Sequence, residues 1–425
     1  MSTEAGALQA EQEIGRPAGG PVLVGLLGHG TVGAAVASMI ERRADAIASL
    51  TGRPPTVCGV LTRSSGSFAE ILDRSEVVIE LIGGIEPARG YVLEALRAGR
   101  HVVTANKQLI CEHGEELFAA ARQSGVQLRF EAAVAGVVPV VRVLTESLAG
   151  IEVKRIHGIV NGTTNFILSA MERGADYEHA LAQAQASGFA EADPEADVSG
   201  ADAAAKMAIL ARLAFGTPVR LADVRYEGIE HLISDDLQYA RELGLSLKLI
   251  GTAERLPDGV CVHVHPAFLY AGHPLASIGG QFNAVTVEAD AITEITMSGP
   301  GAGGPQTASA VLGDLLSVIS STGSPGPPLH PVAEMPLLAD ADSAFYLHME
   351  VADEPGVLVA VAGVLDRSGA SVKSVLQRGL GENARLVMVT HPLSESRLRG
   401  AVREIGELPF VRAAPRAIRV IEEEF

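Results

Sequence analysis

Cysteine is scarce in this sequence. Its 425 residues include three, Cys58, Cys111 and Cys261, which lie far apart along the chain. A disulfide framework uses an even number of cysteines and a zinc site uses closely spaced ligands, so the sequence predicts neither. Thiols that stay reduced are typical of the cytoplasm, and we expect a cytoplasmic protein.

Positive charge and long apolar segments are also in short supply. Lys and Arg number 33 against 51 Asp and Glu, for a formal net charge of −18. This negative balance repels phosphate backbones and anionic lipid, which argues against a nucleic-acid partner. Apolar runs such as Val22–Leu27 are strand-length, well short of the roughly 20 residues that span a bilayer. We therefore expect no membrane partner.

What the chain does have is enough apolar residues, 47% of 425, to fill more than one core. Residues 1–20 lack the pattern of a signal peptide and predict a disordered tail. Residues 21–138 alternate β-rich runs with amphipathic stretches, which is typical of a parallel sheet covered on both faces. The fold class is therefore α/β, beginning with a Rossmann-type, doubly wound NAD(P)-binding domain. The expected strands are Val22–Leu27, Val57–Leu61, Val77–Leu81, His101–Thr104 and Val126–Phe130, and the expected helices are Ala34–Arg43, Ala88–Ala98 and Glu112–Ser124.

Residues 139–322 change in character and predict an α+β domain for substrate binding, catalysis and dimerisation. A helical block, Ala201–Phe215, is stopped by Gly216, and strand-like runs follow at Val260–Phe268 and Val285–Met297. Repeated proline in 323–343 predicts a linker.

Residues 344–425 predict a ferredoxin-like βαββαβ unit. Its expected elements are Phe345–Val351, Val357–Asp366, Ser371–Arg378, Leu386–His391, Leu398–Ile405 and Ala417–Ile421.

A glycine motif, Gly28–Gly33, follows the first expected strand and opens the first helix, the context that a dinucleotide fingerprint requires. Gly28 permits a tight turn, Gly30 lets the backbone approach a pyrophosphate, and Gly33 allows close helix–sheet packing. Free N–H groups at Thr31 and Val32 would hold the anion.

The second expected strand ends at Leu61-Thr62-Arg63, where an NAD-binding chain would carry an acid for the ribose 2′-hydroxyl. The planar fork of Arg63 suits a 2′-phosphate, although an exposed loop arginine is the simpler interpretation. We expect NADP(H) as the preferred cofactor, with NAD(H) as the alternative.

Five further segments carry more information than the glycine motif alone. They are Glu80–Ala88, His101–Lys107, Asn161–Asn165, Gly188–Pro194 and Gly299–Gly304. Together, and in order from about Val22 to Thr322, they resemble the signature segments of homoserine dehydrogenases. The C-terminal unit, with Asp353–Leu358 between its first strand and helix, resembles an ACT domain, an amino-acid-binding module often fused to this enzyme. The resemblance implies reversible reduction of aspartate 4-semialdehyde to homoserine, in the biosynthesis of threonine, methionine and isoleucine.

Reducing an aldehyde requires a proton donor beside the hydride donor, and two lysines are candidates. Asp202 and Lys206 lie one helical turn apart on one face, which by itself is most simply an exposed ion pair. The resemblance favours Lys206 as the acid–base residue. Lys107 follows an expected strand at the edge of the sheet where such domains build their sites, and we expect it to stabilise the developing alkoxide.

The resemblance also implies binding roles. Glu191, Asp197 and Asp202 match substrate-contacting positions, and acidic groups suit the α-ammonium of the substrate. The cofactor would contact Gly83, Lys107, Gly188, Glu191 and Gly303 in addition to the glycine motif.

A monovalent cation, sodium, is a further expectation that comes only from the resemblance. Its ligands would be Glu131, Val134, Gly136 and Val138. Backbone carbonyls and one carboxylate are suitable ligands for a hard cation. The family usually has more glycine where Val137 stands, which puts the site in doubt.

The ACT resemblance predicts regulation by an amino acid, with threonine, the downstream product, as the effector. Asp353 would hold the ammonium, and the helix that begins after Gly356 would take the carboxylate. Such units pair across two-fold axes, so we expect a homodimer or homotetramer. A purely assembling role for this unit is the alternative.

Two other functions remain open from the residues. A reductase of the same architecture with a different substrate is one, and a cysteine-dependent aldehyde dehydrogenase would need Cys111, which has only His113 nearby and is more simply a buried thiol. A non-catalytic NADP-binding sensor is the other, but it has no need to keep Lys107, Glu191, Asp202 and Lys206. His263 and His265 alternate with apolar residues and are interpreted as surface or structural groups.

Overall fold

A computed structural model describes residues 19–321, 333, 335–378 and 384–421. Residues 1–18 of the expected tail, and 323–332 with 334 of the expected linker, lie outside the described residues. The described residues form two compact units: the first takes in residues 19–142 and 302–321, and the second takes in 143–301, 333, 335–378 and 384–421.

The first unit is built on a parallel sheet with the strand order β2-β1-β3-β4-β5. Its strands are β1 Val22–Leu27, β2 Pro55–Leu61, β3 Val77–Glu80, β4 His101–Thr104 and β5 Leu128–Arg129, and its helices include α1 Thr31–Thr51, α2 Phe68–Arg74, α3 Ala88–Arg97 and α4 Lys107–Ser124. All four residues of β3 are buried, as expected for a strand covered on both faces. This confirms the Rossmann-type sheet. The strand order reverses between β1 and β3, and doubly wound sheets bind their ligands at this switch point.

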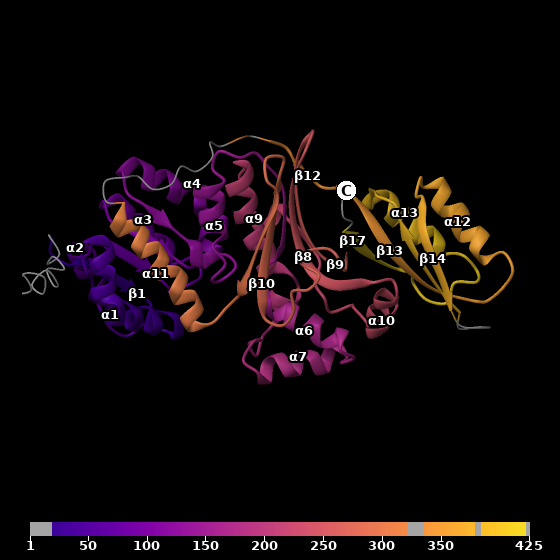
Figure 1. The fold of residues 1–425 in the computed structure, drawn as a ribbon, viewed down its shortest axis with the longest axis horizontal. Coiled ribbons are helices and arrows are strands. Elements are labelled where there is room, and N and C mark those ends of the chain that lie inside the picture. The colour runs from indigo at the N-terminus through magenta and orange to yellow at the C-terminus, as the bar shows by residue number, and fades with distance from the viewer. Residues whose placement is uncertain (1–18, 322–332, 334, 379–383, 422–425) are drawn as a thin grey trace, which may run out of the picture. The chain divides into compact units, whose positions relative to one another are not determined.

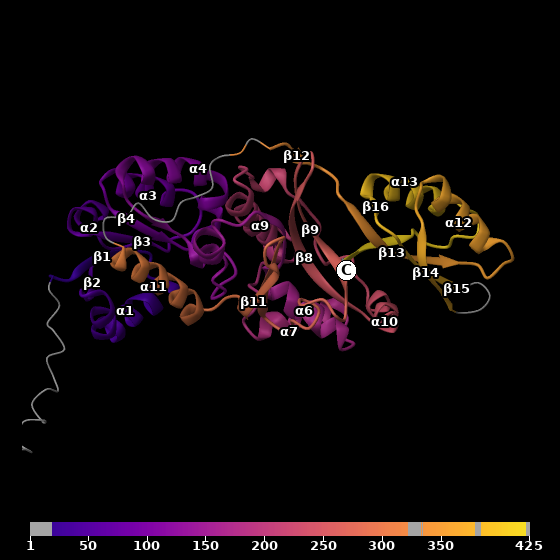
Figure 2. The same ribbon diagram turned by 45° about the horizontal axis from the view of Figure 1, so that its top comes forward.

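The chain returns to this unit through α11, Gly304–Ser320, which packs along α1 (Figures 1 and 2). Val311 and Leu315 of α11 share a buried cluster with Val36 and Ile40 of α1. The segment predicted as 139–322 is therefore divided, and its last helix completes the N-terminal core. The apolar face of α11 could be predicted, but its partner could not.

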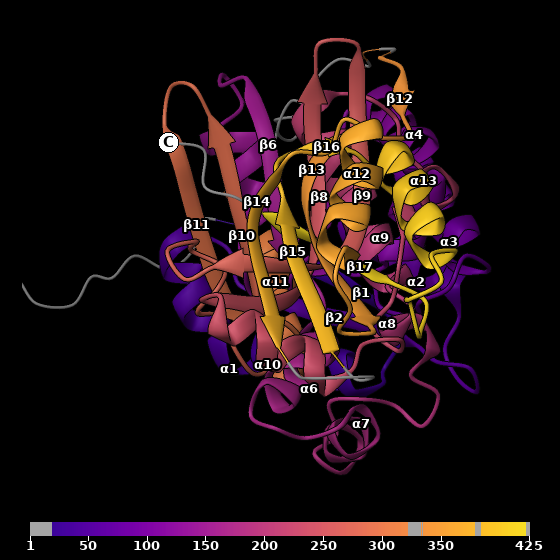
Figure 3. The same ribbon diagram turned by 90° about the vertical axis from the view of Figure 1, so that its right-hand side faces the viewer.

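The second unit contains a mixed sheet whose main path runs β11-β10-β6-β8-β9-β17-β13-β15-β14. Its first strands are β6 Val153–Ile159, β8 Leu245–Leu256, β9 Gly259–Tyr270, β10 Phe282–Ala289 and β11 Thr293–Pro300, and its helices include α6 Gly162–Glu172, α7 Tyr177–Ala186, α8 Glu195–Val198, α9 Ala201–Phe215 and α10 Ser234–Glu242. The predicted strand run Val285–Met297 is in fact the hairpin β10–β11 (Figure 3), which turns between Ala289 and Thr293.

Helix α9 is almost entirely buried, and its predicted bounds are confirmed. Gly216 ends it with a positive φ of 73°. The helix packs on β6, β8 and β9, and glycine in the sheet lets it come close. A Cβ on Gly251 would lie 2.2 Å from Cγ of Met207. This packing fixes the position of the side chains on α9.

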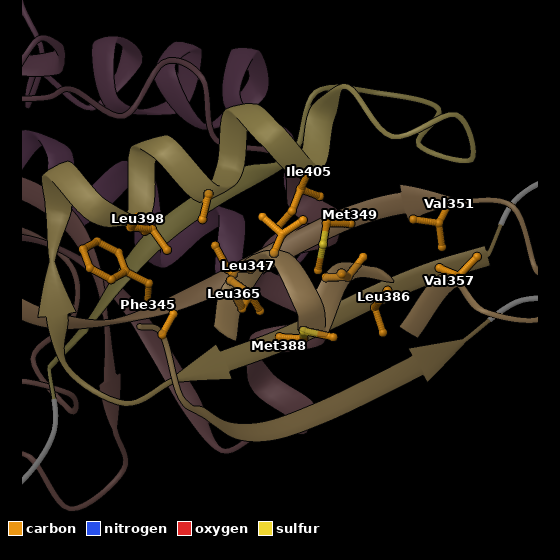
Figure 4. Close-up of a cluster of buried hydrophobic side chains, with 14 of the residues drawn as sticks. Phe345, Leu347, Met349, Val351, Val357, Leu365, Leu386, Met388, Leu398 and Ile405 are labelled. Carbon is orange, nitrogen blue, oxygen red and sulfur yellow. The ribbon is translucent and has the colours of Figure 1, made fainter. Parts of the chain in front are cut away.

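The C-terminal part has the predicted βαββαβ order. Its elements are β13 Asp342–Val351, α12 Val357–Arg367, β14 Val372–Arg378, β15 Ala384–Thr390, α13 Glu395–Gly406 and β17 Arg416–Ile421. Both helices cover one face of the strands, and Figure 4 shows Phe345, Leu347 and Met349 pointing toward Leu398 and Ile405 in a buried cluster.

One edge of β9 carries three short parallel partners in succession. They are β12 Leu337–Leu338, β7 Arg225–Tyr226 and β17. Strand β17 makes the C-terminal sheet continuous with the sheet under α9. Part of the expected linker is therefore a strand, and a bare edge of β9 is covered. In the part of the chain that the structure describes, no helix is long and apolar enough to cross a membrane.

Candidate active site

The glycine motif lies between β1 and α1, at the point where the strand order of the sheet reverses. Gly28 has a φ of +100°, and a Cβ there would lie 2.6 Å from the carbonyl oxygen of Leu81. A Cβ on Gly33 would lie 2.2 Å from the carbonyl oxygen of Gly28. Gly30 differs, because apart from its chain neighbours no atom of the described residues lies within 4 Å of its Cβ position. Packing explains the first and third glycines, while the second faces open space, as close approach of a ligand requires.

Two helix N-termini converge beside this motif. Helix α1 begins at Thr31 with no side-chain cap and no acidic residue in its first turn, so its first N–H groups are available to an anion. Helix α11 begins at Gly304, and a Cβ on Gly304 would lie 3.1 Å from Cγ2 of Thr31. Gly303, with a φ of +131°, precedes it. Both helix dipoles favour negative charge at this place.

Arg63 lies in the turn after β2. The turn is held by Thr62, whose backbone N–H donates to the carbonyl of Ser65 at 2.8 Å and whose hydroxyl accepts the N–H of Ser65 at 3.1 Å. Arg63 is exposed and makes no side-chain hydrogen bond or ion pair with any described residue. Its guanidinium is therefore available for a phosphate.

A buried carboxylate, Glu80, organises the loops that follow β3 and β4. Its Oε1 accepts the N–H groups of Ile82 at 2.7 Å and Gly83 at 3.1 Å, and its Oε2 accepts the hydroxyl of Thr104 at 2.6 Å. Gly83 has a φ of +78°. The carboxylate thus fixes the backbone at the predicted cofactor contact Gly83.

Asn106 extends this network to α4. Its side chain caps the helix by accepting the N–H of Leu109 at 3.1 Å and donates to the carbonyl of Gly84 at 2.6 Å. Lys107 is the first residue of α4 and is half-buried. Its position at the carboxyl end of β4 is therefore set from both neighbouring loops.

In the second unit, Lys206 and Asp202 form a buried ion pair on α9. Nζ of Lys206 donates to Oδ2 of Asp202 at 2.6 Å and to the carbonyl oxygen of Val160 at 2.8 Å. The side chains are 14% and 6% exposed, so the pair is not the exposed i,i+4 bridge that spacing alone suggests. An ammonium group has three N–H donors, and these contacts use two.

Asn161 joins Asp197 and Asp202, two residues that are predicted to contact the substrate. Its Nδ2 donates to Oδ1 of Asp197 at 2.7 Å and to Oδ2 of Asp202 at 2.9 Å. Its Oδ1 accepts the N–H of Thr164 at 2.9 Å and so caps α6. The structure therefore brings Asp197, Asp202 and Lys206 together around one amide.

Gly188 and Glu191 lie in the loop after α7 and are both exposed. Gly188 has a φ of +73°. The loop is tied to α6 by the hydroxyl of Thr163, which donates to the carbonyl of Phe189 at 2.7 Å. No side-chain contact joins Glu191 to the cluster around Asn161 in the described residues, so the structure does not bring this acid into the cluster.

The predicted cation ligands lie near the end of the first unit. Each oxygen of the Glu131 carboxylate accepts a backbone N–H at 2.9 Å, one from Val141 and the other from Arg142. Burial, together with the nearby Asp314 carboxylate, raises the pKa of Glu131 to about 7.

The carbonyls of this segment are partly engaged as well. The carbonyl of Glu131 accepts the N–H of Val134 at 3.2 Å, and that of Val138 accepts the N–H of Val140 at 2.8 Å. Gly136, with a φ of +65°, lies in the turn between them. These contacts occupy one acceptor site on each carboxylate oxygen and on two of the carbonyls, and no step of the reaction is derived through a cation.

The predicted regulatory residues lie between β13 and α12. Gly356 has a φ of +96° and precedes α12, whose first turn has no side-chain cap and no acid. Asp353 is exposed and accepts a hydrogen bond from Nε2 of Gln377 at 3.2 Å. Asp353 therefore lies three residues before Gly356, which precedes the N-terminus of α12.

The thiol of Cys111 is buried inside α4, which fits a packing role better than a nucleophile. His263 and His265 are 8% and 6% exposed, so of the two interpretations, surface or structural groups, burial excludes the first and leaves the second. Both sides of β9 are covered, and alternation with apolar residues does not mark a solvent face in such a strand.

Sequence reasoning did not single out Glu80, Asn106 or Asn161 as site residues. All three stand in segments that carried the family resemblance, and the two asparagines stand directly before a helix, where they are common caps. That position was a usable signal for the caps. Nothing in the sequence showed which carboxylates Asn161 would join.

Comparisons with known proteins agree with this geometry. The family model "Homoserine dehydrogenase" matches residues 139–316, "Homoserine dehydrogenase, NAD binding domain" matches 28–131, and "ACT domain" matches 346–410.

Similar proteins and structures cover from 70% to 95% of the chain. Homoserine dehydrogenase of Mycobacterium tuberculosis is 43% identical over 430 residues, covering 94% of this chain and 98% of the relative. The crystal structure of a homoserine dehydrogenase from Thiobacillus denitrificans has a TM-score of 0.90 at 36% identity and covers 95% and 98% of the two chains. A hyperthermophilic archaeal homoserine dehydrogenase in complex with NADPH has a TM-score of 0.61 at 26% identity and covers 70% of this chain and 97% of its own.

Proposed function

This chain belongs to the homoserine dehydrogenase family, and from that premise we propose which of its residues carry the reaction. It is an NAD(P)-dependent oxidoreductase of amino-acid biosynthesis that interconverts aspartate 4-semialdehyde and homoserine, with a C-terminal ACT domain. The observation that carries the proposal is the buried contact of Lys206 with Asp202 and the carbonyl of Val160.

The nucleotide would lie across the loops that follow β1 and β3. The open space at Gly30 and the two helix N-termini fit a pyrophosphate. When bound, the reduced nicotinamide supplies the hydride for the aldehyde carbon. Arg63 would select NADPH by pairing with the 2′-phosphate, and the archaeal relative that is named in complex with NADPH supports this preference. NAD(H) would then bind more weakly, through the same loops.

Lys206 donates the proton. As the aldehyde carbon accepts hydride, its oxygen takes a proton from Nζ, and the product is the hydroxyl group of homoserine. Asp202 and the Val160 carbonyl hold Nζ in place, so its remaining N–H can be directed at the oxygen. In the reverse reaction the neutral amine accepts the proton.

The carboxylates around Asn161 bind the α-ammonium of the substrate. Asp197 is half-exposed and receives one N–H of Asn161, which leaves further acceptor sites on its oxygens. Glu191 contributes from the loop after α7. Lys107 stabilises negative charge on the cofactor side from the start of α4, the helix that Asn106 caps.

Threonine binds to the C-terminal domain of the dimer and thereby inhibits the enzyme. Strand β14 ends the sheet order, and within the described residues no strand pairs its outer edge. Val375 on this strand is 47% exposed, and Leu358 and Val359 on α12 are 45% and 76% exposed. An apolar, unpaired edge suits a second copy of the chain.

A continuous path leads from this domain to the proton donor. Strand β17 pairs with β9, and α9, which carries Lys206, packs on β9. Ion pairs with α10 add to the connection, including Nε of Arg416 with Asp236 at 3.0 Å and Arg378 with Glu242 at 2.8 Å. Removing residues 342–425 would strip a strand from the catalytic sheet, so point variants test regulation more cleanly.

The test of the proposed function follows NADPH absorbance with aspartate semialdehyde, and NADP reduction with homoserine. We expect both reactions, with a lower KM for NADPH than for NADH. Turnover of neither substrate would contradict the assignment, and equal efficiency with both cofactors would remove the role of Arg63.

A further inference from the structure

A cluster of metal-ligating side chains lies on the β8–β9 hairpin, away from the site around Lys206. Glu254 stands directly opposite Cys261 in the antiparallel register, and His263 is two residues farther along β9 on the same face. One ligand atom from each of the three side chains lies within 4.8 Å of the other two. The spacing of these residues along the chain does not predict a zinc site. The three side chains come close together only through the register of the β8–β9 hairpin.

Burial makes this cluster unusual. Cys261 is 2% exposed and His263 is 8% exposed. Nδ1 of His263 is buried without a hydrogen-bond partner in the described structure, and a buried nitrogen in that state is costly. A cavity of about 130 Å³ adjoins the cluster and is lined by Glu254, His263 and Thr252 among others. The cavity gives a small ligand a place beside the unpaired nitrogen.

We propose that Glu254, Cys261 and His263 form a binding site for a divalent transition-metal ion of the zinc type. A thiolate, an imidazole and a carboxylate are ligands that zinc takes in tetrahedral sites. Water from the adjoining cavity would fill the fourth position. The inference goes beyond the proposed function, since the hydride and proton transfers do not use this ion.

The charges of the cluster support a divalent cation. A thiolate and a carboxylate together offset two positive charges, and the imidazole is neutral. Two arginines near the cluster also form ion pairs, Arg155 with Glu288 at 2.8 Å and Arg419 with Glu395.

The position of the cluster suggests what the ion would do. Leu338 of β12 pairs with Cys261, so the segment that leads into the C-terminal domain runs beside the proposed site. The cavity is also lined by Asp342 and Ser343 of β13. A metal ion would fasten the hairpin at the place where the C-terminal domain joins the catalytic sheet.

Cobalt is a suitable probe, because a thiolate ligand gives Co²⁺ an intense near-ultraviolet charge-transfer absorption. Full-length enzyme is washed with chelator and titrated with Co²⁺, and bound metal is counted after dialysis. We expect one Co²⁺ per chain, a saturable charge-transfer band, and displacement by Zn²⁺. No saturable band, or loss of all metal on dialysis, would overturn the proposal.

Cysteine variants identify the ligand. Cys261→Ser is expected to abolish the band and weaken binding beyond the about 10–100-fold that an outer-shell loss costs. Cys58→Ser and Cys111→Ser are the matched controls and should keep it. A band that survives Cys261→Ser, or that disappears in a control variant, contradicts the assignment.

His263→Gln provides a second variant in case Cys261→Ser does not fold. It keeps the band only at higher Co²⁺ concentration, with affinity reduced at least about tenfold. Zn²⁺ should also raise the thermal midpoint of the wild-type enzyme and leave that of His263→Gln unchanged, because a ligand of the native state alone stabilises it. Equal Co²⁺ affinity in His263→Gln and wild type excludes the site.

Discussion

Asn161 offers a prediction whose magnitude follows from its contacts. Asn161→Ala removes the cap of α6 and the N–H donors to Asp197 and Asp202. The cap contributes about 1 kcal/mol, and a net hydrogen bond to a charged group about 1.5–3 kcal/mol. Water can replace the donor at half-exposed Asp197 but not at Asp202, which is 7% exposed. We therefore expect a loss of about 3 kcal/mol in the free energy of unfolding.

Asn161→Ser is the matched control because serine also caps helices but cannot reach either carboxylate. Its stability should recover by about 1 kcal/mol relative to Asn161→Ala. Kinetics should not recover. Because neither variant holds the carboxylates of Asp197 and Asp202 in place, both should show a raised KM for homoserine, with unchanged affinity for NADPH.

Urea unfolding and steady-state kinetics on the same three proteins check this reasoning. Wild-type kinetics in Asn161→Ser would show that Asn161 is only a helix cap. Full stability of Asn161→Ala would show that the amide supports neither the helix nor the carboxylates.

Three further predictions concern the cofactor, pH and regulation. Arg63→Ala should weaken NADPH binding by about 10–100-fold, the value of a charge-assisted bond, and spare NADH; an equal loss for both would make Arg63 structural. Burial raises the pKa of Glu131 from 4.5 to about 7 and that of Asp314 from 3.8 to about 6. Both carboxyls are protonated more readily in the folded state, so the free energy of unfolding is higher at low pH and falls as the pH rises from about 4 to about 7. For Glu131 alone the fall is about 3 kcal/mol. Thermal midpoints of Asp314→Asn should change less with pH than those of wild type, and identical slopes would refute this. Asp353→Asn should raise the half-inhibitory threonine concentration at least about fivefold at unchanged basal turnover, and insensitivity of the wild type to millimolar threonine would end the proposal.

The periodic parts of the fold could be predicted from the sequence. Helix α9 is confirmed at both ends because its apolar residues recur at helical spacing and Gly216 stops it. The βαββαβ order of the C-terminal domain is confirmed for the same reason, since periods of two and 3.6 residues alternate along it. Helix α2, at seven residues, is too short to show such a period.

Tertiary relationships could not be predicted. The sequence does not show that α11 packs on α1, because an apolar helix face does not name its partner. Nor does it show that Val285–Met297 is a hairpin, since the turn has no glycine or proline.

The site was predictable to a similar degree. The pairing of Asp202 with Lys206 follows from their i,i+4 spacing, whereas their burial depends on the strands beneath α9. In the sequence Glu80 resembles any acid at the end of a strand. Only the structure shows that its carboxylate accepts three hydrogen bonds. The sequence could not decide whether His263 is a surface or a structural group, because alternation shows which side of a strand a residue faces and not what covers that side.

The central claim is that Lys206 gives its proton to the aldehyde oxygen. The most direct measurement is turnover of Lys206→Ala with aspartate semialdehyde and NADPH, with and without small primary amines, beside the affinity for NADPH. We predict turnover at least about a hundredfold lower, NADPH binding nearly intact, and partial recovery by added amines in proportion to their concentration as ammonium. Near-normal turnover without amine, or a parallel loss of NADPH binding with no recovery, would contradict the account.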